Sequence, residues 1–143
     1  MIISRYYQNL NTVGKVKSGI ILFGCLLNII IPTNTGLVHW SPGSILMPLI
    51  FGSIIIPLIA KFNAVFLKSE ISSPKWNENP LNLRKPLVMF DFFAFLFITT
   101  GLGMLLGTFI KFQLINWLAL NVISYGPGIL IGIFLSLKWV NNK

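Results

Sequence analysis

The chain has 143 residues, of which 55% are hydrophobic and only 10% are charged. Water-soluble domains carry about 25% charged residues, and so short a chain cannot enclose several wholly apolar helices in a polar shell. Its net charge of +8 would suggest nucleic acid in a soluble protein, but no basic face with interleaved aromatic residues lies outside the apolar runs. The composition therefore predicts one domain in a lipid bilayer, without nucleic-acid binding.

The first apolar run predicts a span over residues 14–31, with Lys15 and Lys17 extending to the lipid headgroups. A short apolar run after basic residues is also typical of a cleaved signal peptide. Because Pro32 and polar residues follow in place of a small-residue cleavage site, we expect a retained span, and cleavage stays the alternative.

The second run predicts a span over residues 45–67 that is kinked or locally unwound, because it contains Pro48, Gly52 and Pro57. Prolines are frequent in ordinary membrane helices, although a broken helix can also line a transport site. The polar segment before this run contains the single histidine, His39, which has no co-ligand spaced to pair with it.

Residues 68–86 form the longest polar segment and are expected to be a cytoplasmic loop. Proline and asparagine favour turn geometry around the centre of this segment. The segment is the most distinctive polar sequence of the chain, so it is a candidate partner-binding loop, although a simple connector is the other interpretation. The candidate residues are Trp76, Asn77, Glu78 and Asn79.

The last two runs predict spans over residues 87–110 and 114–137. Each is longer than the ~20 residues that a helix needs to cross a bilayer core. A connection of about three residues forces such helices side by side and antiparallel. The predicted fold is thus an all-α integral membrane protein with four transmembrane helices in antiparallel hairpins.

The basic residues predict the orientation of these spans. Of the eleven Lys and Arg residues, all but Lys111 lie in or close to the N-terminal segment, the 68–86 loop and the C-terminal segment. Basic residues concentrate in loops that stay in the cytoplasm. We therefore expect both termini and the central loop in the cytoplasm, and the size and simplicity of the chain suggest a bacterial inner membrane.

Small residues recur at intervals of four on the last two spans and predict close helix packing. The depths of the two sets differ, because one lies in the outer half of the third span and the other runs from the middle of the fourth span to its inner end. The second set is therefore expected to pack on the first span, the second span or a second copy. The residues are Thr99, Gly103 and Gly107, followed by Ser124, Gly128, Gly132 and Ser136.

Asp91 and Lys61 are charged residues at similar depths within predicted spans. Charged groups in a bilayer are costly and are functional candidates, and pairing would offset part of that cost. The two residues are therefore a candidate intramembrane ion pair. In the alternative, both lie close enough to the interface to reach water separately.

Three function classes follow. The first is a non-catalytic complex subunit, accessory protein or immunity-type factor that acts through helix packing and its cytoplasmic loop, with another membrane protein or a second copy as its partner. The second is a small oligomeric transporter or channel that uses Asp91 and Lys61. The third, a lipid enzyme using Asp91 and His39, ranks last, because the predicted topology puts these residues on opposite sides. Three acids, one histidine and one cysteine argue against an autonomous enzyme, a metal site or a cofactor.

Overall fold

The computed structural model describes residues 8–30, 42–110 and 117–141, and this part of the chain is helical with no strand. The helices are α2 (Thr12–Ile30), α3 (Pro42–Phe66), α4 (Pro86–Ile110) and α5 (Trp117–Asn141). All four are long and apolar enough to cross a membrane. The sequence prediction of an all-helical protein with four candidate spans is therefore confirmed.

The helices begin and end where local chemistry permits. Asn11 caps α2, because its Oδ1 accepts a 2.8 Å hydrogen bond from the Gly14 N–H. Proline opens α4, where the missing N–H costs no helical hydrogen bond. At the end of α3 the chain turns at Lys68, whose φ of 51° lies in the left-handed region. The fourth helix extends to Asn141, beyond the expected end at residue 137.

The helix α3 stays unbroken although Pro48 and Pro57 lie inside it. A proline has no N–H for the carbonyl four residues earlier, which for Pro48 is that of Ser44. The Asn121 side chain of α5 donates a 3.1 Å hydrogen bond to this carbonyl. The neighbouring helix α5 thus supplies the hydrogen-bond donor that the proline lacks, which is common in membrane helices that contain proline.

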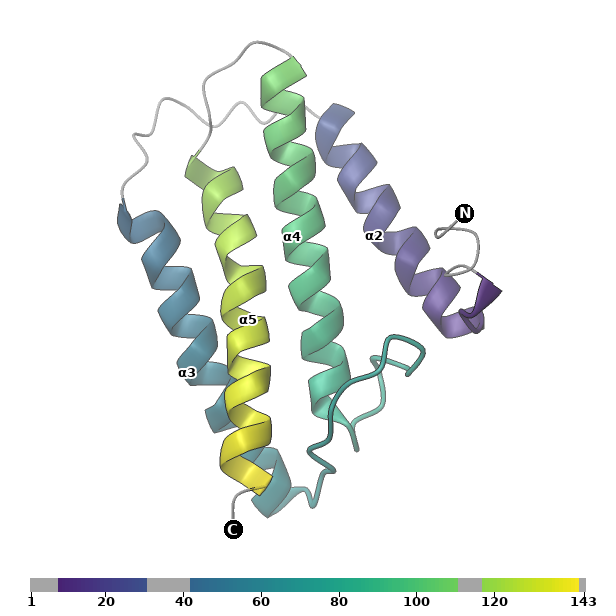
Figure 1. The fold of residues 1–143 in the computed structure, drawn as a ribbon, viewed down its shortest axis with the longest axis vertical. Coiled ribbons are helices and arrows are strands. Elements are labelled where there is room, and N and C mark those ends of the chain that lie inside the picture. Colours follow the sequence, from purple (N-terminus) through teal and green to yellow (C-terminus); the bar gives the residue numbers. More distant parts are fainter. Residues whose placement is uncertain (1–7, 31–41, 111–116, 142–143) are drawn as a thin grey trace.

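The four helices pack as a row in the order α2, α4, α5, α3 (Figure 1). The antiparallel pair α4 and α5 forms the middle of the row, as expected for the last two spans. The first two helices lie at opposite edges and do not pack substantially on each other, unlike a hairpin. The physical reason is that α4 and α5 each offer small residues to a different outer helix.

The buried apolar cluster lies among α3, α4 and α5 and excludes α2. Ile71 of the segment between α3 and α4 packs into it, together with Ile56, Ala60 and Leu87. This segment, the start of α2 and the end of α5 lie at the same end of the row (Figure 1). At this end α2 diverges from α4, and the segment between α3 and α4 occupies the space beside them.

Candidate functional site

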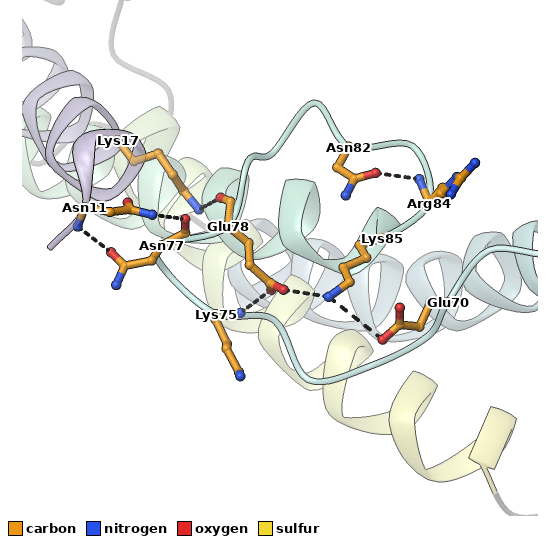
Figure 2. A network of polar contacts seen from close by, with 9 residues as sticks. All are labelled: Asn11, Lys17, Glu70, Lys75, Asn77, Glu78, Asn82, Arg84 and Lys85. Carbon is orange, nitrogen blue, oxygen red and sulfur yellow. Dashed lines mark hydrogen bonds and ion pairs between the residues drawn. The ribbon is translucent and has the colours of Figure 1, made fainter.

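The segment 67–85, here called the central loop, is folded on itself by hydrogen bonds near its ends. The Glu70 N–H donates a 2.7 Å hydrogen bond to the Arg84 carbonyl. The Ser69 hydroxyl donates one of 3.3 Å to the Leu83 carbonyl. These contacts bring the two halves of the loop together. Its middle, residues 75–78, forms a turn that projects from them (Figure 2).

Glu78 holds this turn together. Its N–H donates to the Lys75 carbonyl at 3.1 Å, and one carboxylate oxygen accepts from the Lys75 N–H at 3.0 Å. Its other oxygen accepts a 2.7 Å charge-assisted hydrogen bond from Lys85 Nζ, which also lies 3.9 Å from Glu70. The hydrogen bond from Lys85 lowers the pKa of Glu78, and the same bond raises the pKa of Lys85.

The turn docks on the start of α2 through Asn77 (Figure 2). Asn11 donates to it twice, from its backbone N–H to Asn77 Oδ1 at 3.3 Å and from its side-chain amide to the Asn77 carbonyl at 2.9 Å. Gly14 permits this approach, because a Cβ at that position would collide with Asn77 Oδ1. Asn11 therefore both caps α2 and binds the central loop.

Lys17 is the buried cation of this site, with a relative exposure of 2%. Its Nζ donates a 3.1 Å hydrogen bond to the Glu78 carbonyl and lies 4.6 Å from the centre of the Trp76 ring. Phe92 contributes a second ring at 5.7 Å, and Asp91 interacts with the ammonium electrostatically. Carbonyl, rings and carboxylate together offset the desolvation of the buried ammonium.

Trp76 fills the space that the divergence of α2 opens beside α4. Its Nε1 donates a 3.0 Å hydrogen bond to Ser18 Oγ on α2. Its ring packs edge-on against Phe95 of α4, with the ring centres 5.4 Å apart, and more loosely against Phe92 at 6.2 Å. One side chain from the loop thus links both helices.

Beyond Trp76 lies a groove of about 570 Å³ between α2 and α4. Asp91, half-buried, lines this groove, together with Ser18, Thr99 and Cys25. Within the described part of the chain, the Asp91 carboxylate makes no hydrogen bond and no ion pair shorter than 4.0 Å, and its electrostatic partner is Lys17. The groove therefore combines acidic, hydroxyl-bearing and aromatic residues at the edge of the helix row.

The two residues of the candidate ion pair are placed apart. Lys61 lies on α3, where its Nζ is 4.1 Å from the centre of the Trp139 ring of α5. Asp91 faces α2 and the central loop instead. Lys17 takes the position beside Asp91 because α2, not α3, packs on that side of α4.

The two sets of small residues face opposite edges of the row. Gly103 and Gly107 of α4 lie against backbone atoms of α2, and a Cβ on Gly107 would lie 3.0 Å from the Ile29 carbonyl. Gly128 and Gly132 of α5 lie against α3 in the same way. Thr99 lines the groove beside α2, while Ser124 and Ser136 are buried and donate to carbonyls of their own helix.

The four candidate loop residues are all engaged within the chain. Trp76, Asn77 and Glu78 contact α2 as described, and Asn79 Oδ1 accepts a 2.9 Å hydrogen bond from the Leu81 N–H. Sequence reasoning missed the other half of this contact, which is made by Asn11, Gly14, Lys17 and Ser18. Lys17 within a candidate span was the available signal, but we expected it to extend to the headgroups.

The site therefore has two parts: the central loop, which is hydrogen-bonded to the start of α2, and the adjacent groove, which contains one carboxylate, that of Asp91. His39, from the third function class, lies outside the described residues. Within the described part, no group of three or more His, Cys, Asp or Glu side chains is placed to hold a metal ion. A scan against protein-family models and searches of curated proteins and of solved structures found no match to this chain.

Proposed function

We propose that this chain is a multi-pass membrane protein of a bacterial inner membrane that works as a non-catalytic subunit, accessory protein or immunity-type factor. In this proposal both termini and the central loop face the cytoplasm. The support is the clustering of Lys and Arg at the end of the row that carries the central loop.

The observation that carries the proposal is the open row of helices. The two middle helices expose large apolar side chains, among them Leu102 and Leu106 on α4 and Phe134 on α5, with relative exposures of 45%, 48% and 65%. In a closed bundle the middle of the molecule would be enclosed by other helices. A row instead offers broad apolar faces to lipid, to another membrane protein or to a second copy.

The central loop fits this function as a fixed feature at one end of the row. Its turn is tied to α2, so any partner meets a preformed surface and the loop loses little conformational entropy on binding. The outward-facing groups of that surface include Lys75 and Arg84, both exposed.

The experiment is purification of the tagged protein from native membranes in mild detergent, followed by mass spectrometry and a mass measurement of the complex. We expect a stoichiometric partner or a homo-oligomer. Leu102→Trp and Phe134→Trp should weaken that assembly, because they alter the exposed faces, while the thermal unfolding temperature stays within a few degrees. A monomer at native expression levels, without a partner, contradicts the proposal.

The alternative is a small oligomeric transporter or channel, and the groove with Asp91 favours it. The geometry replaces Lys61 by Lys17 as the cation beside Asp91. Asp91→Asn should abolish ion or solute flux in proteoliposomes if this alternative holds. If the subunit function holds, Asp91→Asn should leave the assembly largely intact.

A further inference from the structure

A second groove, of about 590 Å³, lies between α3 and α5 on the side of the molecule away from the first. Its walls are mainly apolar, with Ile54, Pro57 and Leu58 from α3 and Leu135 from α5. Both helices expose several of these side chains. A groove of this character in a candidate span is suited to a hydrocarbon chain.

Basic and aromatic side chains gather at the loop end of this groove. Lys138 and Trp139 line it. Lys61, five residues before the end of α3, holds its ammonium 4.1 Å from the centre of the Trp139 ring. An ammonium has three N–H donors, so one that lies over a ring keeps donors for an anion.

These two cations have no acidic partner in the described part of the chain. The ion pairs found there join Lys85 to Glu70 and to Glu78. The third acid, Asp91, lies in the other groove beside Lys17. Lys138 in the lining of the groove and Lys61 beside Trp139 therefore carry two positive charges that no acidic residue of the described part balances.

We propose that this groove binds an anionic phospholipid. The phosphate contacts the ammonium groups of Lys61 and Lys138, Trp139 lies at the level of the glycerol backbone, and an acyl chain runs along Pro57, Leu58 and Leu135. Basic pockets between membrane helices on the cytoplasmic side bind anionic headgroups in this way, and Trp prefers the interface depth. The proposal rests on the membrane placement proposed above, but not on the existence of a protein partner.

A zwitterionic lipid satisfies the site less well. Its headgroup carries its own ammonium, which two lysines repel, whereas phosphatidylglycerol brings only the negative charge. Each basic residue near an anionic headgroup contributes to the binding free energy, so removing both lysines should weaken phosphatidylglycerol binding at least about tenfold.

The test uses native mass spectrometry of the full-length protein in mild detergent, titrated with phosphatidylglycerol or with phosphatidylcholine of the same acyl chains. The wild type should retain one phosphatidylglycerol in preference to phosphatidylcholine. Lys61→Gln with Lys138→Gln should bind phosphatidylglycerol at least about tenfold more weakly and so lose the preference. Lys61→Arg with Lys138→Arg should keep the preference. Leu58→Trp, which occupies the apolar wall, should weaken binding of both lipids.

The matched control is Lys68→Gln with Lys75→Gln, which removes the same charge at the same end of the row. If the control loses as much binding as the groove variant, the attraction is a general property of the basic surface and the proposal is wrong. It is equally wrong if the wild type shows no preference for phosphatidylglycerol. Because all four lysines are exposed, each variant is expected to fold, and thermal unfolding checks this. A lost lipid preference with an unchanged protein assembly separates this proposal from the proposed function.

Discussion

Trp76 Nε1 donates a 3.0 Å hydrogen bond to Ser18 Oγ, which joins the middle of the central loop to the wall of α2 across 58 positions of sequence. The same indole contacts both Lys17 and Phe95. Elsewhere α2 contacts only α4 extensively, and it contributes nothing to the main apolar cluster. Trp76 is therefore a principal anchor of α2 at the loop end of the row.

Replacing Trp76 by Phe should loosen the loop without unfolding the helices. Phe keeps part of the apolar contact but cannot donate to Ser18, and a hydrogen bond of this kind contributes about 0.5 to 1.5 kcal/mol. We expect faster amide hydrogen exchange at Trp76–Glu78 and at the first turn of α2. Trp139→Phe, in the groove between α3 and α5, is the control and should leave exchange in the loop unchanged. Equal exchange in Trp76→Phe and the wild type contradicts the anchoring role.

Two glycines of α2 form a matched pair for testing the docked turn. Gly14→Ala places a methyl group against Asn77 Oδ1, so the turn must move and its hydrogen bonds with Asn11 weaken. At Gly19 a Cβ meets nothing within 4 Å, and Ala is a better helix former than Gly by up to about 1 kcal/mol. We expect limited proteolysis of the central loop to accelerate in Gly14→Ala and not in Gly19→Ala. Parallel behaviour of the two variants would show that the close contact at Gly14 is unimportant.

The contact between α5 and α3 has a similar test at Gly132. A Cβ there would lie 2.5 Å from the Gly52 carbonyl and 2.7 Å from Ile56, so the helices must separate. Overpacking of this kind costs about 1 to 3 kcal/mol. Gly132→Ala should lower the thermal unfolding temperature in detergent. Gly24→Ala, whose Cβ would lie 3.7 Å from Leu96, should change it little, and an equal decrease in both variants is the result that sinks this argument.

Much of this fold was predictable because a membrane span is identified by the length and hydrophobicity of one continuous stretch of sequence. Length and apolar composition define α3 and α4 to within three residues at each end. The order of helices in the row was not predictable in the same way. It depends on which face of each helix carries its glycines, and both α4 and α5 carry glycines on two faces, with Gly101 and Gly126 joining these two helices to each other.

The candidate site was predicted in part. Asp91 and the loop residues Trp76, Asn77 and Glu78 were identified as unusual groups, and all of them lie around the same end of α2 and α4. Their partners were not identified, because Asn11 and Ser18 are unremarkable in sequence and gain their roles only from tertiary contact. Lys61 was assigned to Asp91 on depth alone, and depth does not determine which side of a helix a residue faces.

Asn121 tests how the proline in α3 is accommodated. Its amide donates to the Ser44 carbonyl, the group to which Pro48 offers no N–H. Asn121→Leu removes this interhelical hydrogen bond and should destabilise the protein by about 0.6 to 1.7 kcal/mol. Asn28→Leu is the control, because Asn28 Nδ2 donates to Gly24 of its own helix, so its loss should cost less. Denaturant unfolding in mixed micelles measures both changes, and a larger effect at Asn28 would contradict this role.

The ion pair between Glu78 and Lys85 should give the central loop a defined pH range. The hydrogen bond from Lys85 lowers the pKa of Glu78 below its ordinary 4.5, so this stabilisation is fully present above 4.5 and is lost as the pH falls through the folded-state pKa. The hydrogen bond to Glu78 raises the pKa of Lys85 above 10.5, so its stabilisation is present below 10.5 and is lost as the pH rises through the higher value. Hydrogen exchange or protection from an acid-tolerant protease should therefore show that the loop is docked at neutral pH. The loop should open as the pH falls through the folded-state pKa of Glu78. In Glu78→Gln the acid opening should disappear, because Gln does not titrate, and the loop should be less protected at neutral pH. An acid transition that persists unchanged in this variant assigns the pH dependence to another group.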